Sequence, residues 1–107
     1  MKINEAQEKV DKIIRAYGGY WEPLSMLARL TEEVGELSRA MNIEFGGKRK
    51  KHDDDRRELR EEIADVIFTS LALANTLKID VAEELDKKIS KDYNKCKGVY
   101  DDNTNIK

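Results

Sequence analysis

Apolar residues recur along this chain at intervals of three and four positions, the spacing that places side chains on one face of an α-helix. Glycines and a single proline separate four such segments. No run alternates apolar and polar residues between turn signals, so strands are not predicted. The predicted helices run roughly over residues 4–17, 23–45 and 55–77, and from 80 through 93.

The predicted helix starts carry recognisable capping residues. A polar residue followed three positions later by Glu or Gln has the spacing of a capping box, and Pro23 suits the first turn of the second helix. Gly18-Gly19 and Gly46-Gly47 predict the ends of the first two helices. The capping pairs are Asn4 with Gln7, Asp55 with Glu58, and Asp80 with Glu83.

Each predicted helix has one apolar stripe, which we expect to face the core. Phe68 lies about 160° from the centre of the third stripe at 100° per residue, and Ala72 shares that outer face. We therefore expect a second subunit to cover Phe68. The longer stripes are Leu27, Leu30, Val34, Leu37 and Met41 in the second helix, and Leu59, Ile63, Val66, Ile67, Leu71, Ala74 and Leu77 in the third.

These patterns predict an all-α fold, a four-helix bundle whose two long helices are antiparallel. The chain has 107 residues, enough for one domain with one core. We expect residues 1–98 to form this domain and residues 99–107 to form a flexible tail. A helical core this small favours self-association.

Composition narrows the class of function. Apolar and charged residues each make up 39% of the chain, and 20 basic residues nearly balance 22 acidic ones. This balance gives no electrostatic reason to expect a nucleic acid polymer or a membrane as partner. The single cysteine, Cys96, excludes an internal disulfide, and no segment has the pattern of a signal peptide or membrane span. We expect a soluble cytoplasmic protein.

Two acidic strings lie on the two long helices. Taking 100° per residue, Glu33 and Glu62 each lie about 80° to one side of their own apolar stripe, and Glu36 and Asp65 about 140°. Equivalent flanks of antiparallel helices lie on the same side of their seam, so we expect the four carboxylates to converge at the edge of the core. The strings are Glu32-Glu33-Val34-Gly35-Glu36 and Glu61-Glu62-Ile63-Ala64-Asp65.

Four converging carboxylates would repel each other unless a cation lay between them. A hard divalent ion such as Mg²⁺ prefers oxygen ligands and takes substrate phosphates as further ligands. Glu32 is four residues before Glu36 and can still reach the site, whereas Glu61 is expected to face solvent. The alternative is a solvated acidic surface, because Glu-x-x-Glu spacings are common on charged helices.

The combined pattern resembles a known family. The string EEVGE at residues 32–36, followed after 25 residues by EIAD at 62–65, is similar to the signature of the MazG-type, all-α nucleoside triphosphate pyrophosphohydrolases. The similarity extends to Tyr20-Trp21, Pro23-Leu24 and Leu37, and the order of helices fits the chain except for its tail.

The resemblance implies hydrolysis of a (deoxy)nucleoside triphosphate between its α- and β-phosphates, giving the monophosphate and pyrophosphate. It implies that Glu33, Glu36, Glu62 and Asp65 bind Mg²⁺, with Mn²⁺ as a substitute. Glu32 or Glu36 is then a candidate to accept a proton from water. The resemblance also implies a homodimer or homotetramer and a house-cleaning role against non-canonical or surplus nucleotides.

Further substrate-binding candidates follow from the resemblance and from residue type. Trp21 offers a stacking surface for a base, or else closes the start of the second helix as an apolar staple, the interpretation we favour for Tyr20. Lys91 and Asn94 in the last helix resemble polar residues by which relatives contact the substrate. The basic run at residues 48–51 and the adjacent His52 are interpreted as a solvated loop.

Two other classes of protein, a di-iron protein and a non-enzymatic adaptor, also carry acidic helices. A ferritin-like di-iron protein needs Glu-x-x-His pairs, but the only histidine is His52 and Arg49 stands three positions before it. That class is excluded. A non-enzymatic helical dimerisation or adaptor module remains as the alternative, and it predicts no effect of divalent cations on folding or on nucleotide binding.

Overall fold

The computed structural model describes residues 1–46 and 58–97. Within these ranges the chain is helical and contains no strand, which confirms the all-α prediction. The predicted tail, the basic run at residues 48–51, His52 and Asp55 lie outside the described residues. The helices are α1 (Ile3–Ala16), α2 (Pro23–Phe45), α3 (Leu59–Thr76) and α4 (Val81–Cys96).

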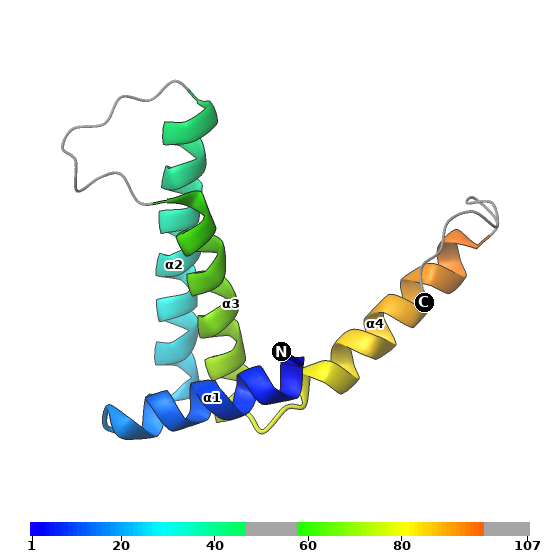
Figure 1. Cartoon of the computed structure of the whole chain (residues 1–107), viewed down its shortest axis with the longest axis horizontal. Helices are drawn as coiled ribbons and strands as arrows, with labels where there is room; N and C mark the ends of the chain where they lie inside the picture. Colours follow the sequence, from blue (N-terminus) through cyan, green and yellow to red (C-terminus); the bar gives the residue numbers. More distant parts are fainter. Residues whose placement is uncertain (47–57, 98–107) are drawn as a thin grey trace.

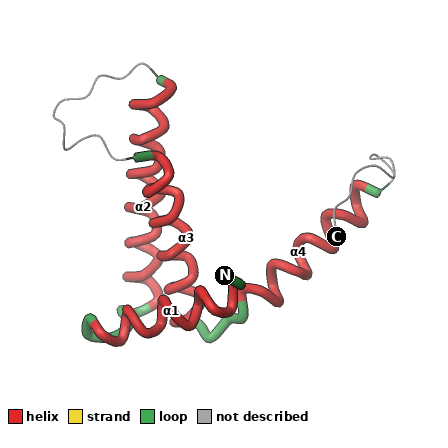
Figure 2. The backbone as a smooth tube through the Cα atoms, in the orientation of Figure 1, coloured by secondary structure: helices red, strands yellow, loops and turns green. Residues whose placement is uncertain are grey.

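Helices α2 and α3 run side by side in opposite directions and form a long hairpin (Figure 1). This pair makes the most extensive helix–helix contact of the described chain. Helix α1 crosses the end of the hairpin where α2 begins and α3 ends, and α4 leads away from the hairpin (Figures 1 and 2). The hairpin is therefore the scaffold on which the two acidic strings lie, and α1 closes one end of it.

The described helix boundaries follow the sequence signals closely. Helix α2 begins at Pro23 and ends at Phe45 as predicted. The Asp80 side chain caps α4 by accepting a 3.1 Å hydrogen bond from the backbone N–H of Glu83. After α1, Gly18 and Gly19 have φ angles of 105° and 94°, a conformation that residues with a Cβ rarely adopt. Helix α3 begins later than predicted, at Leu59 rather than near residue 55.

The apolar core lies where α1 crosses the hairpin. It contains Val10 of α1, Met26 of α2, and Leu71 and Ala72 of α3, with Phe68 packed against it. The prediction that Phe68 and Ala72 face away from the core is wrong. It considered α3 against α2 alone, whereas α1 also packs against α3, so that Ala72 is buried and Phe68 is partly buried against the core.

The predicted burial of the main apolar stripes in the hairpin is also wrong for half of their residues, although Leu71 and Ala74 of the third helix are buried as predicted. Val34 and Ile67 are 48% and 53% exposed. The buried positions of α2 follow a seven-residue spacing one position earlier than the stripe. We define the hairpin flank as five exposed apolar residues of this pair, namely Leu27, Val34 and Met41 of α2 with Ile63 and Ile67 of α3. Leu24 and Phe45, near the two ends of α2, are also exposed but are not part of it.

Gln7 does not cap α1 as predicted; its side chain instead hydrogen-bonds residues at the end of α3 and the start of α4. Its Nε2 atom donates to Asn75 Oδ1 and to the backbone carbonyl of Ile79, both at 2.9 Å. Its Oε1 atom accepts from the backbone N–H of Val81 at 3.0 Å. One side chain of α1 thus satisfies backbone groups of the turn between α3 and α4, which sequence spacing alone could not indicate. Among the described residues, no helix has both the length and the apolar character needed to span a membrane.

Candidate active site

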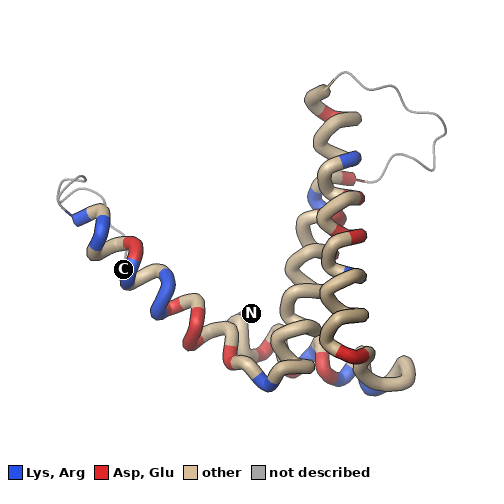
Figure 3. Tube along the Cα trace, turned by 180° about the vertical axis from the view of Figure 1, so that it is seen from behind, with Lys and Arg blue, Asp and Glu red and all other residues tan. Residues whose placement is uncertain are grey.

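The four predicted metal ligands meet in the hairpin. Glu33, Glu36, Glu62 and Asp65 each offer one carboxylate oxygen, and these four oxygens lie within 4.8 Å of one another. The two pairs come from facing turns of antiparallel helices, one three residues apart on α2 and the other three apart on α3. Acidic segments gather along this part of the hairpin in Figure 3, whereas both charges alternate along α4.

The carboxylates lie deeper than the predicted edge of the core. Glu33 is 3% exposed and Glu62 is fully buried, whereas Glu36 and Asp65 are half-buried. The buried acids therefore occupy the seam between the helices, where the sequence predicted the apolar stripes. Burying a carboxylate costs several kcal/mol unless charges or hydrogen bonds compensate, so this seam requires positive charge.

Arg29 supplies part of that charge. Its Nη2 atom lies 2.6 Å from Glu33 Oε1, and its Nη1 atom lies 3.4 Å from Glu32 Oε2. The other oxygen of Glu33, Oε2, is buried and has no hydrogen-bond partner among the described residues. A buried oxygen of this kind fits a metal ligand, because buried polar atoms are otherwise almost always satisfied.

The two remaining acids of the strings are exposed. Glu32 is paired with Arg29 and lies outside the group of four carboxylates. Glu61 is exposed as predicted. The structure thus separates each Glu-Glu doublet into one buried member and one solvent-facing member, a consequence of the 100° turn between successive helical residues.

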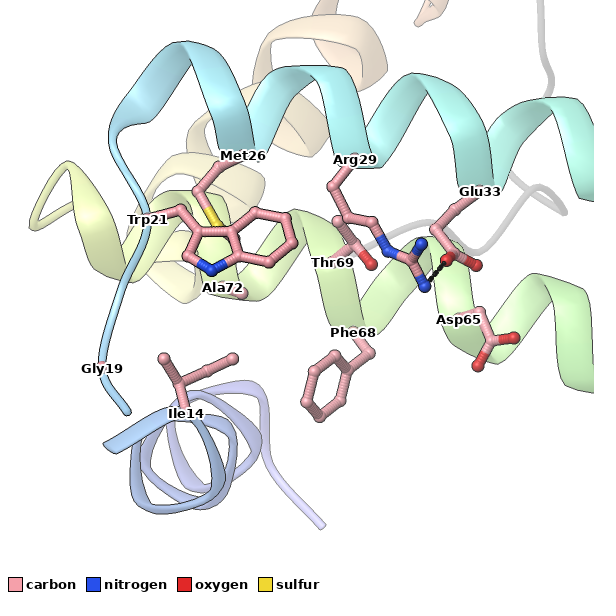
Figure 4. Close-up of a pocket in the computed structure, with 10 residues that line it drawn as sticks. All are labelled: Ile14, Gly19, Trp21, Met26, Arg29, Glu33, Asp65, Phe68, Thr69 and Ala72. Atoms are coloured by element: carbon pink, nitrogen blue, oxygen red, sulfur yellow. Dashed lines mark ion pairs between the residues drawn. The ribbon is translucent and has the colours of Figure 1, made fainter. Parts of the chain in front are cut away.

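A cavity of about 390 Å³ opens beside the acids. Figure 4 shows its two ends: Trp21, Met26 and Ile14 form an apolar end, and the carboxylates of Glu33 and Asp65 form the other. Arg29 lies between these ends. A pocket with apolar walls and a few polar groups at one side is typical of a site for a small organic ligand. Its full lining is Ile14, Gly19, Trp21, Met26, Arg29, Glu33, Asp65, Phe68, Thr69 and Ala72.

The residue before Trp21 connects the apolar end of the cavity to α1. The Tyr20 hydroxyl donates a 2.5 Å hydrogen bond to Asp11 Oδ1, and Arg15 pairs with the same carboxylate at 3.0 Å. These contacts, that of Tyr20 first, lower the pKa of Asp11. Burial, and then the Asp11 contact, raises the pKa of Tyr20. Tyr20 thereby ties the connection before α2 to α1, while Trp21 remains 59% exposed and lines the cavity.

The other predicted substrate contacts lie elsewhere. Lys91 and Asn94 are exposed on α4 and do not line the cavity. In Figure 1, α4 extends away from the hairpin that holds the acids. Within one chain, therefore, the structure does not bring these two residues to the site.

Sequence reasoning missed several residues of the cavity. Arg29 precedes the acidic string by one helical turn, and this i,i+4 spacing to Glu33 could have identified it as a charge partner. Phe68, which follows Asp65 on α3, is predicted on the outer face, and the sequence gives no signal for Thr69. Ile14 of α1 could not have been found, because the crossing of α1 over the hairpin is a tertiary feature.

Comparison with known proteins agrees with this geometry. Residues 21–100 match the family model of the MazG nucleotide pyrophosphohydrolase domain. The Bacillus subtilis protein YpjD is 43% identical over 90 residues, which are 83% of this chain and 81% of YpjD. Its crystal structure gives a TM-score of 0.76 at 41% identity, covering 85% of this chain and 92% of that one.

Two other crystal structures are similar. A MazG protein conserved in Bacillus, described as a nucleotide pyrophosphohydrolase, has a TM-score of 0.72 and 36% identity over 85% of this chain and 88% of its own. The iMazG protein of Vibrio DAT 722 has a TM-score of 0.64 and 26% identity over 89% and 97% of the two chains. With four carboxylates converging beside a pocket, the chain therefore belongs to the MazG family of nucleotide pyrophosphohydrolases and is an enzyme of that type.

Proposed function

We propose that this enzyme hydrolyses a (deoxy)nucleoside triphosphate between the α- and β-phosphates in the presence of Mg²⁺, releasing the monophosphate and pyrophosphate. The observation that carries the proposal is the arrangement of the cavity. Two of the four converging carboxylates, Glu33 and Asp65, line one end, and apolar and aromatic side chains form the other. Its size and its two chemically distinct ends suit a ligand that joins a flat base to a chain of phosphates.

The donor set supports a hard divalent cation. Glu33, Glu36, Glu62 and Asp65 would hold it through carboxylate oxygens, the ligands that Mg²⁺ and Mn²⁺ prefer. The buried Glu33 Oε2 atom supports this fit, because it lacks a hydrogen-bond partner among the described residues. When bound, the cation neutralises charge on the phosphates and lowers the pKa of water at the site.

The chain's own residues would orient the substrate and accept the proton. Trp21 offers its exposed indole face to the base, with Met26 and Phe68 behind it in the cavity wall. Water would attack the phosphate chain, the bond between the α- and β-phosphates would break, and a carboxylate would take the water's proton. Glu36 and Glu32 are the candidates: Glu36 belongs to the group of four carboxylates, and Glu32 lies outside it.

We further propose a homodimer or homotetramer that completes the site. The hairpin flank exposes five large apolar residues on one side of the molecule, which supports burial by a second copy. Lys91 and Asn94 lie on a helix that leads away from their own cavity. They would therefore contact substrate only in the cavity of another subunit.

A panel of nucleoside triphosphates, each with Mg²⁺, Mn²⁺ or EDTA, tests the activity. We expect pyrophosphate, not orthophosphate, from at least one of them, and none in EDTA. Preference within the panel for non-canonical nucleotides would support the house-cleaning role. Activity that survives EDTA would contradict the metal site, and a protein that binds neither cation nor nucleotide in calorimetry would instead be the adaptor module.

The role of Trp21 has a separate test. Because it is the only tryptophan, its fluorescence should be quenched by a bound nucleotide. Stacking on an aromatic side chain contributes about 1–3 kcal/mol per base, so Trp21→Ala should raise KM about tenfold or more with little change in metal affinity. An unchanged KM would place the base elsewhere.

A further inference from the structure

Arg29 occupies the boundary between the two ends of the cavity. Its side chain crosses from the apolar end toward the carboxylates, and Figure 4 shows its guanidinium between the indole of Trp21 and the carboxylate of Glu33. A ligand with its base near Trp21 and its phosphates near the acids must pass this guanidinium. Arg29 is therefore placed beside the phosphate chain, although its contacts in the structure are to acids.

Arg29 contacts two acids to which the proposed reaction gives other roles, Glu33 as a metal ligand and Glu32 as a candidate base. Its 2.6 Å contact engages Oε1 of Glu33, a nearly buried carboxylate of the proposed metal site, while its 3.4 Å contact engages Glu32. A divalent cation bound by Glu33 and the guanidinium are both positive and lie at the same carboxylate. The cation can take Oε2 while Arg29 contacts Oε1, but Coulomb repulsion between two positive charges on one carboxylate makes the binding of each oppose that of the other.

The Arg29 side chain is exposed enough to move away from Glu33. Its side chain is about half exposed, whereas that of Glu33 is almost fully enclosed. The carboxylate is thus fixed in the seam, and the long arginine side chain is the mobile partner. Planar guanidinium groups bind phosphate oxygens through two parallel hydrogen bonds as well as they bind carboxylates, so a triphosphate in the cavity offers Arg29 an equivalent partner.

We propose that Arg29 is an exchangeable counter-ion of the site. Without the metal it neutralises Glu33, and when a divalent cation takes Glu33 it moves to a phosphate of the substrate. This inference rests on the proposed function and adds a coupling to it. Metal binding at Glu33 frees the Arg29 guanidinium to contact the nucleotide. A bound nucleotide, in turn, draws Arg29 away from Glu33 and so favours the metal there. By linkage, each ligand then strengthens the binding of the other.

Arg29→Gln tests the exchange, because it predicts opposite effects on the two ligands. Loss of a charge-assisted contact changes affinity about tenfold. Mn²⁺ alone, titrated by calorimetry, should bind about tenfold more tightly to the variant than to wild type. Analogues of the common nucleotides with an α,β-imido bridge, followed by Trp21 fluorescence in saturating Mn²⁺, should bind about tenfold more weakly.

A matched control is Arg60→Gln, which removes the same group from another ion pair, with Glu58, outside the cavity lining. We expect neither affinity to change in this variant. Arg29→Lys keeps the charge without the planar fork, so its metal affinity should stay near that of wild type while nucleotide binding weakens. It also serves as the test if Arg29→Gln does not fold.

The outcomes separate this inference from the proposed function. A purely structural ion pair would weaken both affinities or change neither in Arg29→Gln, and either result would overturn the exchange while leaving wild-type hydrolysis in place. If wild type itself binds Mn²⁺ and nucleotide in neither assay and releases no pyrophosphate, the proposed function fails as well. Tighter metal binding together with weaker nucleotide binding is the signature of exchange alone.

Discussion

The two sides of the α2/α3 hairpin differ in what they expose. On one side, Arg29, Asp65 and Phe68 line a cavity that α1 partly encloses. On the other, the hairpin flank leaves Val34 and Ile67 about half exposed. Since helical positions after the buried seam turn to the same side in both antiparallel helices, the flank forms one face. One side is hollow and charged, and the other is apolar and uncovered.

The proposed function and the proposed assembly each account for one side of this difference. The seam buries Glu33 and Glu62 and needs positive charge. The flank exposes apolar area, which a second copy would cover in the assembly proposed above. Charge in the seam would then serve catalysis, and the apolar area of the flank would serve assembly. Substitutions on the two sides should therefore have effects that can be told apart.

The largest expected effect is on turnover. Asp65→Asn should lower kcat at least about a hundredfold, because it removes a proposed ligand that helps stabilise charge in the transition state. The fold should remain intact, and the melting temperature without metal should be unchanged or higher, since one of four neighbouring negative charges is removed. Steady-state kinetics and circular dichroism melting measure both quantities.

The neighbouring doublet offers the control for this prediction. Glu61→Gln removes one negative charge from α3 at an exposed position beside Glu62, and it should leave kcat nearly unchanged. If Asp65→Asn unfolds the protein, Asp65 is a structural ion-pair partner and its assignment to the metal is wrong.

The second-largest effect is expected at the end of the hairpin that α1 closes. Leu71 is buried in the core that α1 completes, so Leu71→Ala should lower the free energy of unfolding by about 2–5 kcal/mol. Urea denaturation measures the change, and the loss should be the same at every protein concentration because this core lies within one chain. A loss that grows on dilution would mean that the core itself depends on a second subunit.

A substitution on the hairpin flank should instead change how the melting temperature depends on protein concentration. Ile67→Glu should yield a smaller species in light scattering and a melting temperature that no longer falls on dilution, because a charge at this position opposes association. The same substitution at Ile13, a half-exposed residue of α1, should leave the molecular mass unchanged. An unchanged mass for Ile67→Glu would place the interface away from the flank.

The smallest expected effect concerns the support of Trp21. Tyr20→Phe removes the hydrogen bond to Asp11, so the melting temperature should fall by a few degrees near neutral pH. The pKa of Asp11 is lowered in the folded state, so its contribution is present above the ordinary carboxyl pKa and is lost as the pH falls through the lowered value. The difference between variant and wild type should therefore shrink in acid.

That pH dependence also tests the assignment. A difference in melting temperature that stays constant from neutral to strongly acidic pH would show that the Tyr20 hydroxyl acts through something other than ionised Asp11. In that case the position of Trp21 would depend on packing alone, and its fluorescence should be equal in the two proteins.

Local signals in the sequence determined much of this protein. The 3.6-residue periodicity, Pro23, the glycine pair after α1 and the Asp80 cap define where helices begin and end, because these effects act within a few residues. The spacing of Glu33 with Glu36, and of Glu62 with Asp65, also predicted convergence. Helical geometry and an antiparallel hairpin are sufficient for that result.

Only the tertiary structure decided which faces are buried. Periodicity identifies an apolar face without saying what covers it, so the sequence placed Val34 in the core and Phe68 outside it, the reverse of what is observed. The crossing of α1 and the burial of charge in the seam depend on contacts between residues far apart in the chain. Arg29 acquires its place between Trp21 and Glu33 in the same way. A sequence pattern constrains the angle of each side chain about its helix, but burial is a property of the neighbours that folding brings to it.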